Sequence, residues 1–143
     1  MAITQGMCTS FKVQLLNGAQ NFSSDTFSLA LYTSSASLGE STTAYTTSGE
    51  VASTGNYTAG GNALTVNVTP TSSGNVAYVS FANTSWANAT ITANGALIYN
   101  TSQSNATVCV LAFGGDKTST NGTFAVNFPT ADATSAIIRL TAS

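Results

Sequence analysis

Alternating apolar and polar residues recur along most of the chain after residue 25, and this period of two predicts β-strands. The clearest case is Thr26–Thr33, in which Phe27, Leu29 and Leu31 would share one face of a strand. The dipeptide Asn94-Gly95 is a strong signal for a two-residue hairpin turn. Further strands are predicted at 63–68, 76–81, 89–93, 96–99, 107–113, 123–128 and 136–140. About eight short strands with turns between them indicate a mostly-β fold, an antiparallel sandwich or barrel.

The first sixteen residues follow a different pattern. Residues 1–9 are small or polar without a period, and we expect an extended arm whose apolar Ile3 and Met7 contact a neighbouring subunit. Ser10 is a plausible N-cap of a short helix that ends near Gly18. A strand is the alternative, because apolar residues also alternate in Phe11–Leu16. Residues 10–143 are predicted to form one β-rich domain.

Residues 34–62 consist mainly of Thr, Ser, Gly and Ala. A loop of this length without structure is uncommon in a compact domain, so we expect short edge strands near 43–47 and 50–53 and a turn at 59–62. Partial disorder is the alternative reading of such a composition. The spaced aromatic residues Tyr45 and Tyr57 favour an ordered segment.

The most unusual property of the sequence is its lack of charge. Only 6% of the 143 residues are Asp, Glu, Lys or Arg, against about 25% in an average soluble domain. A folded chain of this size exposes about 7,000 Å². Each of the eight charged side chains therefore has about 900 Å² of surface, whereas soluble proteins carry many more charged side chains on the same area. A neutral surface is suited to contact with other proteins in an assembly. The alternative interpretation of this composition is a secreted or adhesive domain. Three basic residues are too few for a nucleic-acid interface.

Few residues in the chain could carry chemistry. There is no histidine, and the five acidic residues are isolated from one another in the sequence. The segment Gly114–Thr118 resembles a phosphate-binding loop but lacks its spacing, and we interpret it as a hairpin turn. Cys8 and Cys109 lie beside apolar residues and are predicted to be buried free thiols, with a disulfide between them as the alternative. We therefore expect no enzyme, no metal, no cofactor and no small-molecule substrate.

Two further observations concern location and the single tryptophan. The first residues lack the basic start and apolar run of a secretory signal, and no apolar run approaches the length of a membrane span. We therefore expect a chain that is made in the cytosol and has no membrane partner. Trp86 lies among small polar residues and could be a sugar platform, a core residue or an interface residue.

Taken over nearly its full length, the sequence resembles a family of small virion structural proteins of tailed bacteriophages. The matching segments are Met7–Lys12, Leu15–Gly18, Thr26–Ala36, Thr42–Tyr45, Gly49–Val51, Tyr57–Gly61, Ala89–Asn100, Phe113-Gly114 and Phe128-Pro129. The resemblance implies a virion component that is assembled in the host cytoplasm.

The position on the virion is our own inference from the neutral composition. We expect a capsid-decorating (cement) protein that binds the major capsid protein shell, other virion proteins or copies of itself. A tail or head-to-tail connector protein is one alternative, and a carbohydrate-binding β-sandwich at a tail tip is another. The residues expected at the interface are Ile3, Met7, Tyr45, Tyr57 and Trp86.

Overall fold

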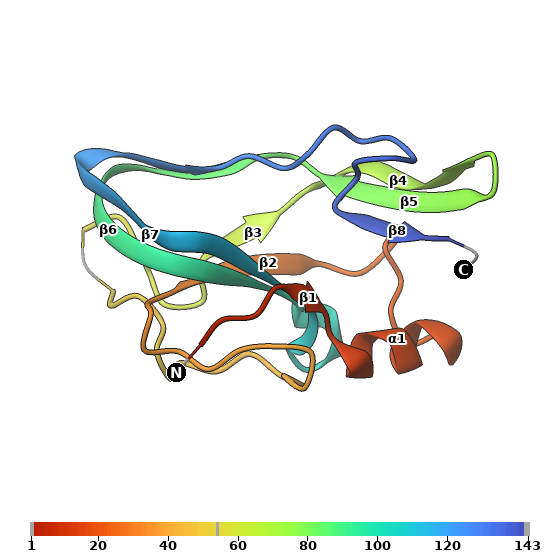
Figure 1. Ribbon diagram of the computed structural model, residues 1–143, viewed down its shortest axis with the longest axis horizontal. Helices are drawn as coiled ribbons and strands as arrows, with labels where there is room; N and C mark the ends of the chain where they lie inside the picture. The colour runs from red at the N-terminus through yellow and green to blue at the C-terminus, as the bar shows by residue number, and fades with distance from the viewer. Residues whose placement is uncertain (1, 54, 142–143) are drawn as a thin grey trace.

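The computed structural model describes residues 2–53 and 55–141, which form two antiparallel sheets and one short α-helix (Figure 1). The first sheet has the strand order β1-β7-β6-β2-β3, and the second has the order β4-β5-β8. The described residues thus confirm the prediction of a mostly-β, sandwich-like fold, with open sheets rather than a closed barrel. The elements are β1 (Gly6–Met7), α1 (Thr9–Leu16), β2 (Phe27–Tyr32), β3 (Asn62–Leu64), β4 (Val66–Ser73), β5 (Val76–Phe81), β6 (Thr84–Asn100), a 3-10 helix (Thr101–Gln103), β7 (Ala106–Val126) and β8 (Ile138–Leu140).

The long hairpin of β6 and β7 dominates the first sheet. Figure 1 shows both strands bending back on themselves, so that the half of the hairpin farther from its turn at residues 101–105 forms a layer above the half next to that turn. The bend coincides with a shift in register, because Ala93 pairs with Lys117 whereas Gly95 pairs with Ala112. The extra residues of β7 include Gly114-Gly115, which the sequence pattern predicted to be part of a hairpin turn; they form a bulge within one strand.

The prediction of a hairpin turn at Asn94-Gly95 is wrong, because β6 continues through both residues. Gly95 is required for packing instead. A Cβ atom at this position would lie 2.5 Å from the carbonyl oxygen of Leu111 and 2.8 Å from a methyl carbon of Ile3. Two predicted strands therefore merge into β6, and the strands predicted at 107–113 and 123–128 merge into β7.

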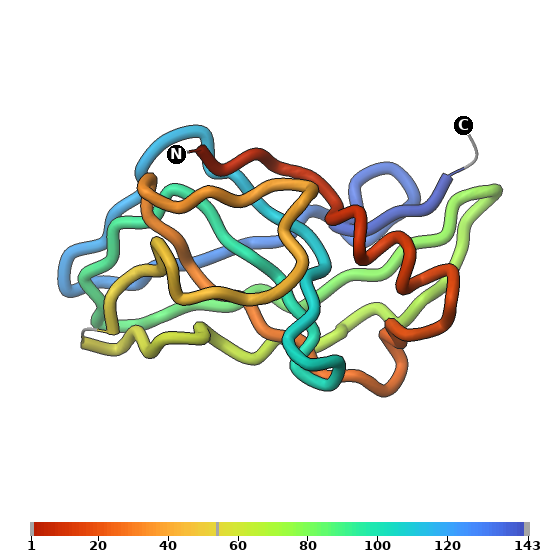
Figure 2. Tube along the Cα trace, turned by 90° about the horizontal axis from the view of Figure 1, so that it is seen from below, coloured from red at the N-terminus to blue at the C-terminus, as the bar shows by residue number. Residues whose placement is uncertain are grey.

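The segment between β2 and β3 lies across one face of the first sheet, where Figure 2 shows it as an orange-to-yellow trace. Its described residues, 34–53 and 55–61, contain no strand, so the predicted edge strands are wrong. Isolated bridges from Ala44 and Glu50 lie at those places. The predicted turn at 59–62 is confirmed by a hydrogen bond from the Gly61 N–H to the Thr58 carbonyl. Gly61 has a φ of +76°, and a Cβ there would lie 1.8 Å from the Leu29 carbonyl oxygen.

The second sheet begins where the predicted strand 63–68 divides. Residues 62–64 pair with β2 as β3, and the chain then crosses to the other sheet as β4. Pro70 does not end β4, because β4 is an edge strand and proline is tolerated at an edge. The strand predicted at 76–81 is confirmed as β5, and a two-residue turn at Gly74-Asn75 joins it to β4.

The N-terminal segment is extended, as predicted, but it lies on its own domain. Gly6 pairs with Val110 and Met7 with Cys109, while Ile3 bridges to Leu38. This pairing places Ile3, Gly6 and Met7 against the chain's own domain, and the expected contact of residues 1–9 with a neighbouring subunit stays a prediction.

The helix that follows is confirmed as α1, and Phe11 anchors it in the core. It begins earlier than predicted, because Cys8 and not Ser10 occupies the N-cap position. The Cys8 side chain makes no capping hydrogen bond, so packing against the core rather than a polar cap fixes the start of the helix.

Aromatic side chains fill the space between the layers. Near α1, the ring of Phe22 stacks on Phe27 at a centroid distance of 4.7 Å and meets Phe11 edge to face. Under the bent hairpin, Trp86 packs between Tyr57 and Phe124. The accessible surface of 7046 Å² agrees with the area expected for a folded chain of this size. In the described part of the chain, no helix has the length and apolar character needed to cross a membrane.

Candidate assembly surface

The structure places the five predicted interface residues mostly inside the domain. Tyr57 is 1% exposed and Trp86 is 3% exposed, so neither can contact a partner. Their selection as interface residues is wrong, because Tyr57 points inward from the polar segment between β2 and β3, and this segment covers Trp86. Tyr45 is half-buried and stacks on Tyr99 at 4.7 Å. Ile3 and Met7 are half-buried against the core.

Glu50 is the centre of a hydrogen-bonded cluster that holds this covering segment in place. Tyr45 Oη donates to Glu50 Oε1 at 2.6 Å, and Tyr57 Oη donates to Oε2 at 2.7 Å. The Gly60 N–H donates to the same Oε2 at 2.6 Å. Tyr57 Oη also accepts the Leu31 N–H of β2 at 2.9 Å. The cluster therefore ties the segment to β2 and leaves neither oxygen of Glu50 without a partner.

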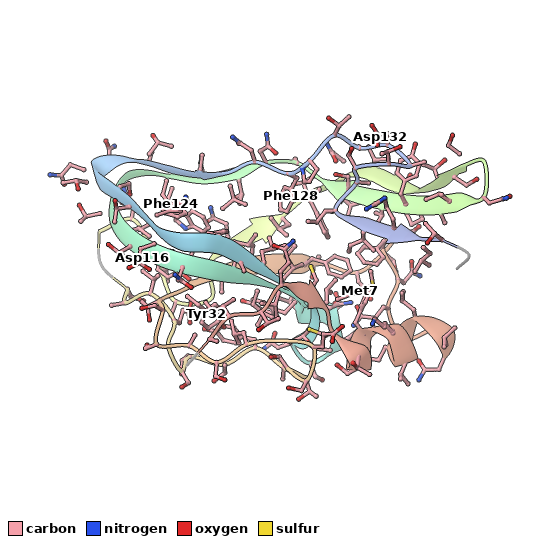
Figure 3. The ribbon with its side chains drawn as sticks, viewed as in Figure 1. Met7, Tyr32, Asp116, Phe124, Phe128 and Asp132 are labelled. Atoms are coloured by element: carbon pink, nitrogen blue, oxygen red, sulfur yellow. The ribbon has the colours of Figure 1, made fainter. Side chains whose placement is uncertain are left out.

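The tyrosines of this region are poor acids. Burial raises the pKa of Tyr32 and Tyr57 well above the ordinary value, and the nearby Glu50 carboxylate raises both further. Burial and the same carboxylate also raise the pKa of Tyr45. The phenols therefore stay protonated at neutral pH and act as hydrogen-bond donors. Figure 3 shows Tyr32 between the sheet and the covering segment, where its Oη donates to the Thr46 carbonyl at 2.6 Å.

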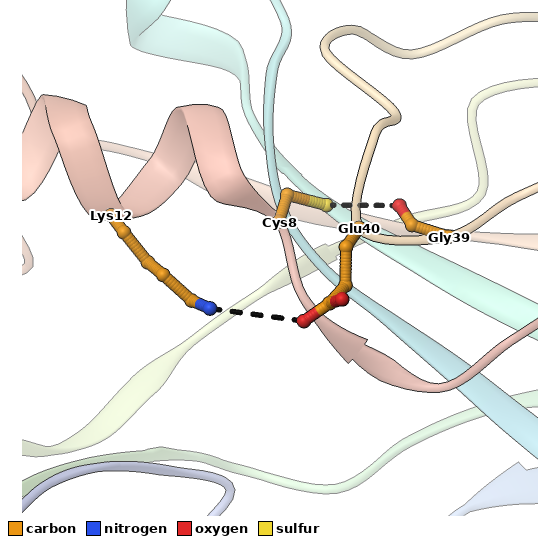
Figure 4. Close-up of polar contacts among 4 residues, drawn as sticks. All are labelled: Cys8, Lys12, Gly39 and Glu40. Carbon is orange, nitrogen blue, oxygen red and sulfur yellow. Dashed lines mark hydrogen bonds and ion pairs between the residues drawn. The ribbon is translucent and has the colours of Figure 1, made fainter.

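The other four acidic residues stabilise local structure in separate places. Asp25 accepts hydrogen bonds from the Asn21 N–H and the buried Asn100 amide, and Asp132 caps the turn at residues 134–135. Asp116 accepts a hydrogen bond from Asn94 across the bulge, far from Asp132 in Figure 3. On the surface, Glu40 Oε2 lies 3.8 Å from Lys12 Nζ and forms an ion pair with it (Figure 4). Among the described residues, no group of three or more His, Cys, Asp or Glu is placed to hold a metal.

Both cysteines are buried as free thiols, and their burial agrees with the prediction. Cys8 Sγ makes a weak hydrogen bond of 3.8 Å to the Gly39 carbonyl (Figure 4). Burial raises the pKa of Cys8, and it raises the pKa of Cys109 to about 12. Because the thiolate is the reactive form, neither residue is suited to nucleophilic chemistry in the folded protein.

An apolar surface lies at the end of the molecule formed by α1 and β8. The large apolar side chains that the described residues leave exposed are Val13 at 55%, Leu16 at 90% and Leu140 at 51%. Beside them, a groove of about 230 Å³ runs between α1 and the second sheet. Its lining residues are Leu15, Gln20, Asn21, Phe22, Pro70, Ala77, Tyr78, Val79, Ile138 and Leu140, none of them charged. We call these exposed side chains and the groove the α1–β8 surface.

No residue of the α1–β8 surface was among those predicted from the sequence. Val13 and Leu16 are three positions apart and lie on the same side of α1. Phe11 faces the core from α1, so the helix is apolar on two sides. A helix that only covers its own domain normally has a polar outer face. Two apolar residues on the outer face were therefore the available signal.

A second groove of about 430 Å³ runs along β7 beside the bulge. Its apolar lining residues are Phe113, Phe124, Ala125 and Val126, and its polar ones are Lys117, Thr118, Thr123 and Asn127. Unlike the α1–β8 surface, it includes a charged side chain. Trp86 does not line this groove, and its burial is not compatible with a role as a sugar platform.

Comparisons with known proteins add no relative to this picture. A scan against models of protein families, a search of curated proteins and a search of solved structures find no match to the chain.

Proposed function

We propose that this chain is a structural component of a tailed-bacteriophage virion, and that it decorates the capsid by binding the major capsid protein shell. The observation that carries the proposal is the nearly uncharged surface. Eight charged residues belong to a molecule that exposes 7046 Å², or one per roughly 900 Å², far fewer than solubility alone favours. The resemblance to small virion structural proteins supports the same conclusion.

A neutral surface of hydroxyl and amide groups is favourable at a permanent protein interface. Such groups exchange hydrogen bonds with water for hydrogen bonds with a partner, whereas charged groups carry a large desolvation penalty. Apolar contact contributes about 25 cal/mol per Å², so burying a few hundred Å² outweighs an exposed ion pair worth about 0–1 kcal/mol. We therefore expect attachment through apolar and hydrogen-bonded area.

A non-enzymatic role is part of this proposal. Each acidic residue has a partner that stabilises a turn, a bulge, a loop or the helix surface. The thiols and the phenols of the Glu50 cluster have raised pKa values that keep them protonated at neutral pH. Those groups therefore serve the fold.

The decisive experiment is the copy number of the chain in purified virions, measured by quantitative mass spectrometry against the major capsid protein. Hundreds of copies are expected for a decoration protein. A dozen or fewer copies would instead favour the tail or connector alternative, and absence from the particle would overturn the proposal as a whole.

A salt series on the same particles tests how the protein is held. At about 0.5 M NaCl the Debye length falls well below 10 Å, so a charge-based contact would weaken. We expect the protein to remain bound between low salt and this concentration. Progressive release from intact particles as salt rises would contradict the proposed neutral interface.

A further inference from the structure

We propose that the half of β7 beyond the bulge, residues 117–126, binds an extended segment of another protein. The segment adds to the sheet as an antiparallel strand and places an acidic residue beside Lys117. The binding site is the groove of about 430 Å³ that runs along β7, which we call the β7 groove. This binding mode does not depend on the virion role, because it follows from the open edge of one strand.

One edge of this half of β7 has no strand beside it. Strand β6 pairs with the opposite edge along residues 117–126. On the open side, β1 pairs with β7 before the bulge, at Cys109 and Val110. Just beyond that pairing, Gln5 Oε1 accepts the Ala112 N–H at 3.1 Å. In the ranges that the structure describes, β1 and β6 are the strands that pair with β7, so the edge beyond the bulge stays open.

The other strand edges are protected against pairing. Strands β1, β3 and β8 have two or three residues each, and β4 contains a proline. On the corresponding half of β6, side-chain amides cover the edge, because Asn62 donates to the Ser85 carbonyl at 3.0 Å and Asn56 donates to the Ala87 carbonyl at 2.6 Å. Short strands, prolines and covering groups are common ways to block an edge. Residues 118–126 contain no proline and no charge.

Two hydrogen bonds show which backbone groups of β7 point to the open edge. The Ser85 carbonyl binds Asn62 and therefore points away from β7. Ser85 pairs with Ala125, and in an antiparallel pair both residues direct their backbone groups towards each other or both direct them away. Ala125 therefore directs its N–H and C=O to the open edge. The Phe128 N–H donates to Asn83 Oδ1 at 2.7 Å on the β6 side, so the preceding residue points outward, as Ala125 does.

These outward groups identify the occupant as a polypeptide in an extended conformation. Ala125 and Asn127 each offer an N–H and a C=O, about 7 Å apart along the strand. Both residues line the β7 groove. In the described part of the chain, no turn or loop backbone bond uses these groups. A neighbouring strand repeats its donors and acceptors with the same period, and strand addition to an open edge is a common mode of peptide recognition.

The wall of the groove favours apolar side chains on one face of the added strand. Phe113, which precedes the bulge, lies 6.3 Å from Phe124 beyond it, measured between ring centroids. Figure 3 shows Phe124 between the two layers of the bent hairpin. Val126 lines the same groove. Because side chains alternate in a strand, we expect every second residue of the bound segment to be apolar.

Lys117 gives the site a charge and a direction. It is the charged residue among the described residues that line the β7 groove. It pairs with the buried Ala93, so its side chain starts on the buried face of the hairpin. No carboxylate of the described residues forms an ion pair with it. The strand pairs of both sheets are antiparallel, so an added strand runs from Asn127 towards Lys117 and brings an acidic residue near its C-terminal end to the lysine.

Binding of a synthetic peptide to the purified full chain, measured by fluorescence polarisation, tests the proposal. The probe is fluorescein-Thr-Val-Thr-Val-Thr-Val-Glu-amide, and we expect a dissociation constant on the order of 100 μM. Replacing its Glu by Gln should weaken binding about three- to fivefold. Lys117→Gln should have the same effect on the Glu peptide and none on the Gln peptide. The matched control is Lys12→Gln, a second exposed lysine outside the groove, which should change neither.

Two further measurements distinguish strand addition from other contacts. N-methylation at successive positions of the peptide should abolish binding at every second residue, because alternate N–H groups of a strand face β7. Amide hydrogen exchange at Ala125 and Asn127 should slow when the peptide is bound, with no change at Leu16. Absence of binding up to about 1 mM, equal effects of the two lysine variants, or N-methyl effects without alternation would overturn the proposal. Protection of Ala125 and Asn127 in concentrated protein without peptide would also overturn it, because a second copy would then be the occupant.

Discussion

Removal of one hydroxyl from the Glu50 cluster should destabilise the whole domain. In Tyr57→Phe the ring remains against Trp86, but two hydrogen bonds disappear: the one donated to Glu50 at 2.7 Å and the one accepted from the Leu31 N–H at 2.9 Å. Tyr57 is 1% exposed and Leu31 is fully buried, so water cannot replace the lost hydroxyl without a rearrangement.

The magnitude follows from these two contacts. A hydrogen bond to a charged group contributes about 1.5–3 kcal/mol, and a buried N–H left without a partner costs about 1–3 kcal/mol. Because the Glu50 carboxylate keeps its bonds from Tyr45 and Gly60, we expect a total loss of about 2–4 kcal/mol rather than the full sum. For a domain of this length, that corresponds to a melting temperature lower by about 7–13 °C.

The assay is urea unfolding followed by circular dichroism, with the free energy extrapolated to water. The control is Tyr78→Phe, which removes a hydroxyl from half-exposed β5 outside the Glu50 cluster and should change stability by less than about 0.5 kcal/mol. The reasoning is refuted if Tyr57→Phe unfolds within about 0.5 kcal/mol of the natural chain, or if both variants lose the same amount.

Three further predictions concern pH, a glycine and a thiol. Burial raises the folded-state pKa of Tyr32 and Tyr57 above the unfolded value near 10, so the unfolded chain ionises first as pH rises. The stability of the folded protein should therefore be complete below pH 10 and fall as pH rises further. A urea midpoint that is the same at pH 8 and pH 11 would contradict this prediction. Gly61→Ala should destabilise the protein by at least about 2 kcal/mol more than Gly18→Ala in thermal melts, because both positions have positive φ but only Gly61 approaches the backbone of β2. Cys109 should react with a thiol reagent only as fast as the domain opens, because its thiol is buried and its pKa is raised to about 12. If Cys109 in the folded protein reacts as fast as an exposed thiol, its burial is disproved.

The sequence by itself determined the features that depend on neighbouring residues. Alternation placed β2 and β5 correctly, and the turn residues Gly74-Asn75 joined β4 to β5. The Ser10–Leu16 segment favoured the helix that became α1. The lack of charge is likewise a property of composition, so it needs no knowledge of which residues meet in space. These signals are local, and the fold class followed from their sum.

Only the tertiary structure decided the features that depend on residues far apart in the chain. Asn94-Gly95 has the local preference for a turn, but Ile3 and Leu111 approach Gly95 so closely that it serves as a packing position in a continuous strand. Tyr57 is anchored inward by the hydrogen bond that it donates to Glu50 and the one that it accepts from the Leu31 N–H of β2, and Trp86 packs against its ring. Which apolar residues stay exposed was likewise decided by packing. Spacing along the chain cannot show which residues meet in space, because chain folding brings together positions that share no local pattern.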